Sequence, residues 1–315
     1  MTLQGAFLLS PQYRDYVWGG NRLRPGHSPT AEAWVVYEQD QIASGIHAGK
    51  TLAEVAQMYA PQLLGRRVFE QTGSRFPLLI KLLDVADWLS LQVHPNDEQA
   101  FKLEGESFFG KTEAWYFIES REDAEMLCGL RPGTTPEILE QAIKDGFLVD
   151  YMQRLPVKEG DSIFIPPGMI HALGPGLLLY EVQQTSDITY RVFDWNRPVT
   201  SKRQLHIEKS LQVADPSASG KINPASPISD GGRTTLITCP YFTLELLAAR
   251  ENEIDLDTGS TSFNALTVIQ GSLHLKGDNW ELDLMQFDTA LVPAASGAYR
   301  VCPLEPYRLL RAFVE

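Results

Sequence analysis

The chain has 315 residues, of which 43% are hydrophobic and 21% charged, a balance typical of a soluble globular protein with a sizeable core. Its formal charge of −13 argues against nucleic acid or an anionic membrane as partner, because both require a basic face. A small anionic substrate is not excluded. Three cysteines without CxxC spacing predict reduced thiols and a cytoplasmic location. The first residues show no signal-peptide pattern, and no apolar run approaches the ~20 residues of a membrane span.

Helix signals are few, and each begins at a capping residue. Three helices are predicted, over residues 51–60, 96–104 and 135–145. The first opens with the capping box formed by Thr51 and Glu54 and is expected to end at Pro61. The second opens at Asn96, and the third ends at Gly146, a residue type that favours the left-handed helix stop.

Short runs rich in β-branched and aromatic residues make up most of the remaining chain. They include AWVVYE (33–38), FPLLIKLLDV (76–85), EAWYFIE (113–119), DSIFIPP (161–167), LLLYEVQQ (177–184) and ITYRVFDW (188–195). Glycine, proline, asparagine and aspartate separate these runs, a pattern that predicts a mainly β fold with a few short helices.

One change of composition predicts the domain organisation. Residues 215–232 contain three prolines, three glycines and four serines, which is typical of a linker or a long surface loop. The segment separates a first module, residues 1–214, from a second β module, residues 233–315. Short strands continue in the second module.

Two histidines, one amide and one carboxylate form a candidate metal site. The alternation in LSLQVHPND (89–97) places Gln92 and His94 on one face of a predicted strand. Glu113 begins another strand, and His171 follows the turn Pro-Pro-Gly at 166–168. An isolated histidine is more often structural, but two histidines and a carboxylate on separate β segments suit a divalent metal ion such as zinc. Gln92 could add a fourth, neutral donor.

The sequence resembles a known family at these positions. Gly160-x5-Pro166-x-Gly168-x2-His171 has the form of the second cupin motif without its final asparagine, whereas the first motif is divergent, with Gln92-x-His94 in place of His-x-His. Together with YVWGG, AEAW, LLDVADWLSLQVHPND, GKTEAWY, IPPGMIHALG and EVQQTSDITYRVFDW, spread over roughly residues 11–200, this set is similar to the short bacterial form of type I phosphomannose isomerase.

The resemblance implies a zinc enzyme that interconverts mannose 6-phosphate and fructose 6-phosphate on two cupin-type jelly-roll modules. It places the ligands of one metal ion at Gln92, His94, Glu113 and His171. It places the active-site lysine, glutamate and arginine at Lys111, Glu181 and Arg191. The chain lacks the large helical insertion of longer members, so their oligomeric state cannot be transferred to it.

The chemistry of the reaction is consistent with these assignments. An aldose–ketose isomerisation through an enediol requires an acid and a base, and positive charge beside the developing oxyanion. From position alone, an exposed strand lysine is the favoured interpretation of Lys111. Glu181 is equally a structural ion-pair residue or an acid–base residue. Arg191 suits phosphate or forms a salt bridge with Asp187 or Asp194. The proton-transferring group is left open between Lys111, Glu181 and a water at the metal, and the metal between zinc, manganese and cobalt.

Other basic and aromatic residues are weaker candidates for substrate contact. The phosphate candidates besides Arg191 and Lys111 are Arg197, Lys202 and Arg203. Trp18, Trp34 and Trp115 either line a sugar pocket or belong to the core. GKTE is not a P-loop, because a strand and not a helix follows it.

The second module has the sequence pattern of a cupin half but lacks its metal-binding histidine. Pro293 stands in the place of Pro166, and Ala298 in the place of His171. The sequence therefore predicts one metal site, in the first module, and the resemblance implies that the chain isomerises mannose 6-phosphate. The alternatives are an isomerase of another sugar phosphate, an oxygen-consuming iron cupin and a non-catalytic sugar-phosphate sensor.

Overall fold

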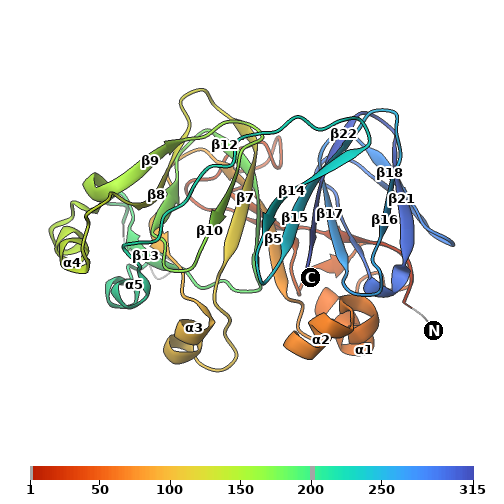
Figure 1. Cartoon of the computed structure of the whole chain (residues 1–315), viewed down its shortest axis with the longest axis horizontal. Helices are drawn as coiled ribbons and strands as arrows, with labels where there is room; N and C mark the ends of the chain where they lie inside the picture. Colours follow the sequence, from red (N-terminus) through yellow and green to blue (C-terminus); the bar gives the residue numbers. More distant parts are fainter. Residues whose placement is uncertain (1–2, 199–202) are drawn as a thin grey trace. The chain divides into compact units, whose positions relative to one another are not determined.

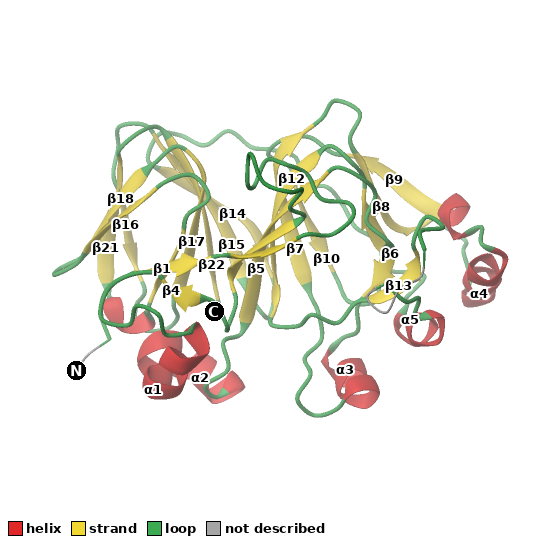
Figure 2. Ribbon diagram, turned by 180° about the vertical axis from the view of Figure 1, so that it is seen from behind, coloured by secondary structure: helices red, strands yellow, loops and turns green. Residues whose placement is uncertain are grey.

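The computed structural model describes residues 3–198 and 203–315 and separates the chain into two compact units. Unit 1 contains the residues up to Gln12, Trp34–Lys81 and Ser226–Glu315, and unit 2 contains Tyr13–Ala33 and Leu82–Ala225. Strands dominate both units, and the helices are short (Figure 2). The mainly β fold predicted from the sequence is confirmed.

Unit 2 contains two groups of antiparallel strands that pack face to face. In the first, the order is β10 (Ser162–Ile165), β7 (Glu113–Ser120) and β12 (Leu177–Gln184). In the second, it is β13 (Tyr190–Phe193), β6 (Leu91–Val93), β11 (His171–Leu173), β8 (Glu125–Leu130) and β9 (Met152–Pro156). Trp115, Phe117 and Leu179 of the first group share one buried cluster with Met126 and Cys128 of the second.

Unit 1 is built in the same way. One sheet has the order β14 (Gly232–Thr238), β15 (Thr243–Ala249), β22 (Tyr307–Phe313), β17 (Asn264–Gln270), β20 (Thr289–Val292), β1 (Phe7–Ser10) and β4 (Gln41–Ile42). The other has the order β16 (Ile254–Asp257), β21 (Ala298–Pro303), β18 (Leu273–Lys276) and β19 (Glu281–Leu284). Leu266, Leu309 and Leu275 belong to the core that both sheets share. Strands β14, β15, β22 and β17 run side by side in Figure 1.

The strand order repeats between the units. β10-β7-β12 in unit 2 corresponds to β20-β17-β22 in unit 1, and β6-β11-β8-β9 corresponds to β16-β21-β18-β19. The order of these strands along the chain is also the same in both units. Strands β2 (Gln12–Arg14), β3 (Glu32–Val36) and β5 (Leu78–Val85) each contain residues of both units.

Capping patterns predicted most helix boundaries. Helices α3 (Asp97–Glu104) and α4 (Pro136–Asp145) lie where they were expected, and Gly146 adopts the left-handed conformation with φ 77°. Helix α1 (Leu52–Leu64) begins at the Thr51 capping box and is interrupted two residues before Pro61, close to its expected end, but helical backbone resumes and runs to Leu64. Tyr59 leaves the helical region, with φ −138° and ψ 26°, and this kink gives the proline ring room.

The sequence did not reveal two further helices. These are α2 (Arg66–Thr72) and α5 (Ile207–Val213). Residues 215–231 lie outside strands and helices, and β14 begins at Gly232. Among the described residues, no helix is both long and apolar enough to cross a bilayer.

Candidate active site

Three candidate metal ligands converge in unit 2. His94 follows β6, Glu113 is the first residue of β7, and His171 is the first residue of β11. One ligand atom from each lies within 4.8 Å of the others. Glu113 Oε1 is 3.1 Å from His171 Nε2 and 3.7 Å from His94 Nε2. All three side chains are buried, with 2% exposure or less.

Strand register brings these residues together. Glu113 pairs with Ile165, the residue before Pro166, and His171 pairs directly with Gln92. Gln92 Nε2 is 3.3 Å from His171 Nε2. In this orientation the amide N–H donates to the ring nitrogen, whereas a half-turn of the amide would present its oxygen as a donor atom for a metal.

Backbone carbonyl groups fix the tautomers of both histidines. His94 Nδ1 donates to the carbonyl oxygen of Ile188 at 2.8 Å, and His171 Nδ1 donates to that of Met169 at 2.9 Å. A carbonyl oxygen can only accept a hydrogen bond, so Nδ1 carries the proton in each ring. The Nε2 lone pairs therefore point towards Glu113, as in a metal site whose histidines are oriented through their other nitrogen.

Electrostatics support the same interpretation. Burial, and then the positive charge of Lys111, hold the pKa of His94 well below its usual value, so the imidazole is neutral, the form that binds metal. Burial opposes ionisation of Glu113, but the positive charge of Lys111 is the largest opposing influence, and the carboxyl pKa lies well below its usual value.

Glu113 meets the requirements of a ligand for a cation. Both of its carboxylate oxygens are buried, and neither forms a well-oriented hydrogen bond within the described part of the chain. With the proton of His171 on Nδ1, Glu113 Oε1 and His171 Nε2 are two acceptors facing each other at 3.1 Å. A divalent cation between them would satisfy both, so the residues fit the metal that the sequence predicts.

Lys111 links this cluster to Glu181. Its Nζ is 2.9 Å from Glu113 Oε2, 3.3 Å from His94 Nε2 and 3.6 Å from Glu181 Oε1. Both Lys111 and Glu181 have about 4% exposure. Lys111 is therefore a buried cation and not an exposed strand residue.

Arg191 lies next to the cluster, on β13. It pairs in register with Gln92, so the two side chains share one face of the sheet. Its Nε donates to Ser90 Oγ at 3.1 Å, its Nη1 donates to the carbonyl oxygen of Gln204 at 3.1 Å, and its backbone N–H donates to His206 Nδ1 at 3.2 Å. Burial, followed by the charge of Arg203, lowers the pKa of the Arg191 guanidinium.

Neighbouring acids bind the other arginines that were considered for the phosphate. Arg203 Nε donates to Asp194 at 2.7 Å, while Arg197 binds Asp194 at 3.2 Å and Asp87 at 2.6 Å. Asp194 therefore serves these two arginines. Lys202 lies outside the described residues.

The three candidate tryptophans are buried. Trp18 and Trp115 belong to the core of unit 2, and Trp34 is 4% exposed. Trp115 packs edge-on against His171, with ring centroids 5.3 Å apart. Trp115 therefore packs against the candidate metal ligand His171, and it is a core residue rather than a substrate contact.

Sequence reasoning missed Ser90, which shares the alternation of Gln92 and His94 and was detectable from it. It also set His206 aside, because a contact between residues 15 positions apart leaves no periodic signal.

Unit 1 has a different polar cluster at the corresponding place in its sheets. Asn264 begins β17 and pairs with Val292, the residue before Pro293, as Glu113 pairs with the residue before Pro166. Arg311 donates to Glu245 at 2.8 Å and to Asn264 Oδ1 at 3.0 Å. A buried arginine is thus the cation of this cluster.

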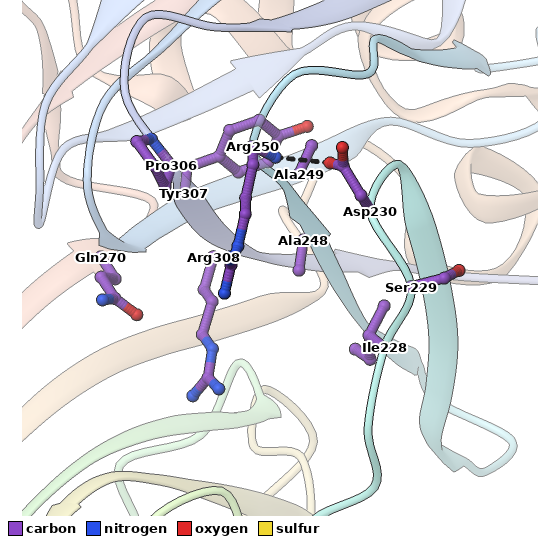
Figure 3. A pocket seen from close by; sticks show the side chains of 10 residues that line it. All are labelled: Ile228, Ser229, Asp230, Ala248, Ala249, Arg250, Gln270, Pro306, Tyr307 and Arg308. Carbon is purple, nitrogen blue, oxygen red and sulfur yellow. Dashed lines mark hydrogen bonds between the residues drawn. The ribbon is translucent and has the colours of Figure 1, made fainter.

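Unit 1 also contains a cavity of about 420 Å³ (Figure 3). Arg250 and Arg308 extend into the same space, and the backbone N–H of Arg250 donates to Asp230 at 2.6 Å. The residues that line it include no histidine and one carboxylate, so this cavity has no set of metal ligands.

Comparisons with known proteins agree with the site. The family described as "Phosphomannose isomerase type I, catalytic domain" matches residues 6–132. A mannose-6-phosphate isomerase of Streptococcus mutans is 38% identical over 75% of this chain and 76% of its own length. The mannose-6-phosphate isomerase ManA of Bacillus subtilis is 33% identical over 96% of each chain. A crystal structure of the mannose 6-phosphate isomerase from Bacillus subtilis superimposes with a TM-score of 0.87 at 31% identity, covering 98% of this chain and 99% of that one. The fold, the buried cluster and the relatives lead to one conclusion: this chain belongs to the type I phosphomannose isomerase family.

Proposed function

We propose that the chain interconverts mannose 6-phosphate and fructose 6-phosphate with one divalent metal ion, zinc, held by Gln92, His94, Glu113 and His171. The observation that carries the proposal is the buried convergence of two Nε2 lone pairs and an ionised carboxylate within 4.8 Å. When bound, the ion would polarise the sugar oxygens at which negative charge develops. Nitrogen and oxygen donors suit zinc, and they also accept manganese and cobalt.

Lys111 and Glu181, beside the cluster, would transfer protons, and Lys111 would also stabilise the negative charge that develops on the sugar oxygens. Isomerisation transfers a proton between C2 and C1 of the open-chain sugar through an enediol. Lys111 Nζ and Glu181 Oε1, 3.6 Å apart, can exchange a proton with each other and with a sugar held beside them. The Lys111 ammonium also provides positive charge next to the enediolate oxygens.

Arg191 would bind the phosphate group. Its guanidinium is a planar donor that matches phosphate oxygens, and the nearby charge of Arg203 adds to the attraction for an anion. Arg197 and Arg203 bind Asp194, and they would support the pocket from behind this group.

The non-catalytic sensor is the less favoured function. A sensor needs no acid–base pair, yet the structure buries both Lys111 and Glu181 beside the metal cluster, and burying charges is costly. We further propose a cytoplasmic location, supported by three free cysteines.

The test is formation of fructose 6-phosphate from mannose 6-phosphate, followed by NMR. Activity should disappear with a chelator and return with zinc. Recovery with manganese or cobalt but not zinc would change the metal assignment. No product with any divalent ion, in a protein that still binds mannose 6-phosphate, would favour the sensor. Turnover of glucose 6-phosphate, the C2 epimer, in place of mannose 6-phosphate would favour another sugar-phosphate isomerase.

A further inference from the structure

Lys111 enters the site from a loop and not from a strand. It lies between the end of α3 at Glu104 and the beginning of β7 at Glu113, and residues 106–108 of this loop are exposed. A loop backbone has no sheet ladder to fix its direction. The position of the Lys111 ammonium therefore depends on what holds residues 110–112.

A carboxylate and an amide hold the two ends of this segment. Asp97 Oδ1 accepts from the Gly110 N–H at 2.8 Å and from Gln184 Nε2 at 3.0 Å. The other end of the Gln184 amide, Oε1, accepts from the Thr112 N–H at 3.0 Å. Asp97 and Gln184 thus form one continuous clamp across the backbone around Lys111.

The remaining backbone contacts tighten the clamp. The Lys111 N–H donates to the carbonyl oxygen of Pro95 at 2.9 Å, and the Gln184 N–H donates to that of Thr112 at 3.1 Å. A Cβ atom at Gly110 would lie 2.5 Å from the backbone carbon of Asn96, so the segment lies directly against the beginning of α3.

The metal cluster is held by other interactions. Backbone carbonyl groups orient His94 and His171, and the backbone of Glu113 lies in the β7 ladder between β10 and β12. Loosening the clamp should therefore displace Lys111 more than the ligands. Its effect should fall on the chemical step and not on metal binding.

We propose that Asp97 and Gln184 are positioning residues for Lys111: the Asp97–Gln184 clamp fixes the backbone of residues 110–112 and thereby the distance of the ammonium from Glu113 and Glu181. This inference rests on the proposed isomerase function. Asp97, in the first turn of α3, would thus affect turnover without touching the substrate.

Exchanging the donor and the acceptor of the clamp tests this role. Gln184→Glu places a carboxylate against Asp97 and should lower kcat by about 10- to 100-fold, the cost of a small displacement of a catalytic group. KM and metal content should stay at the values of the unmodified zinc enzyme. Asp97→Asn alone keeps an acceptor for Gly110 and should be mild.

The double variant Asp97→Asn/Gln184→Glu removes the repulsion between two carboxylates, but it cannot rebuild both bonds, because one atom, Asp97 Oδ1, accepts from Gly110 and from Gln184. It should therefore recover only part of kcat. Glu98→Gln is the matched control, because it removes a charge from the same exposed turn without contacting residues 110–112. Hydrogen–deuterium exchange of the peptide over 108–114 provides a second measurement. Gln184→Glu should speed its exchange, and so should Asp97→Ala, which breaks the clamp without adding charge.

Each outcome decides the proposal. Unchanged kcat and unchanged exchange in Gln184→Glu and Asp97→Ala would overturn it. A loss of kcat that comes with loss of zinc would mean a general structural role and would overturn it too. If Gln184→Glu fails to fold, the Asp97→Ala comparison decides. Absence of isomerase activity in the unmodified protein would instead refute the proposed function, and the exchange data would still show whether the clamp holds residues 110–112.

Discussion

Replacing Arg311 by methionine tests the polar cluster of unit 1. The Arg311 side chain is 9% exposed and that of its partner Glu245 is 12% exposed, so the ion pair is largely excluded from water. Methionine retains much of the length of the side chain but removes the cation. Loss of one partner from a buried pair leaves an uncompensated charge, which costs about 3–5 kcal/mol.

The expected result is a clear loss of stability without loss of activity. At roughly 2 °C per kcal/mol for a chain of this size, the melting temperature should fall by about 6–10 °C. Circular dichroism melts measure this change, and isomerase assays and metal analysis of the same samples should show no difference. Arg300→Met is the matched control, because Arg300 forms its ion pairs with Asp255 and Glu253 at the surface and such pairs contribute little.

A second variant separates charge from packing. Arg311→Met combined with Glu245→Leu removes both charges and should recover most of the lost stability. A melting temperature of Arg311→Met equal to that of the unmodified protein would refute the argument from charge burial. Failure of the double variant to recover would assign the loss to the other contacts of Arg311, which are its hydrogen bond to Asn264 at 3.0 Å and the Phe313 ring 4.2 Å away.

Three further variants test the active site, and a fourth tests the pH dependence of unit 1. His171→Ala should abolish metal retention and keep the β signal in far-UV circular dichroism; stoichiometric metal in this variant would contradict the ligand assignment. Lys111→Met should lower kcat by about 10²–10⁴-fold, the usual contribution of a proton-transferring group, and a rate within a few-fold of the parent would remove Lys111 from the chemistry. Arg191→Lys should raise KM about 10- to 100-fold, because a charged hydrogen bond worth ~1.5–3 kcal/mol is lost, while an unchanged KM would place the phosphate elsewhere. Burial, and then the charge of Lys50, lower the pKa of His47. The unfolded chain therefore takes up a proton first as the pH falls below about 6.5, and stability decreases there. His47→Phe should flatten this decrease in urea titrations at pH 7 and 5, and an equal slope would show that His47 does not contribute.

Local signals made much of the fold predictable. Capping residues such as Thr51 and Asn96 act within a single turn, so the beginnings of α1 and α3 could be predicted from neighbouring residues. The end of α1 was not predictable in this way. Pro61 normally stops a helix, yet helical backbone resumes after the kink at Tyr59 and runs to Leu64.

In the candidate site, too, residues marked by local sequence patterns could be predicted, whereas contacts between distant residues could not. His94 and His171 could be proposed as metal ligands because strand alternation and the Pro-Pro-Gly turn are visible in the sequence itself. The Asp97–Gln184 contact joins residues 87 positions apart, and the contact of Arg191 with Ser90 joins residues 101 positions apart. Both depend on sheet register, which a single sequence does not specify.

The two units stabilise buried polar groups at corresponding positions in different ways. Pairing places Asn264 of β17 where Glu113 lies in β7, since each opposes the residue before a proline. Ala298 then corresponds to His171, because it pairs with β16 as His171 pairs with β6. With a neutral amide and a methyl group at these positions, no ligand set for a metal remains there.

Arg311 supplies the missing positive charge in unit 1. Lying on β22 as Glu181 lies on β12, it binds Asn264 directly and neutralises Glu245. A protein cation cannot be exchanged or removed by a chelator, so this cluster stabilises its unit permanently. Within the described part of the chain, the partners of Glu113 in its cluster are Lys111 and the imidazoles of His94 and His171. Arg311 thus compensates the buried charge of unit 1, whereas His94, Glu113 and His171 in unit 2 form a group that could hold a cation bound from solution.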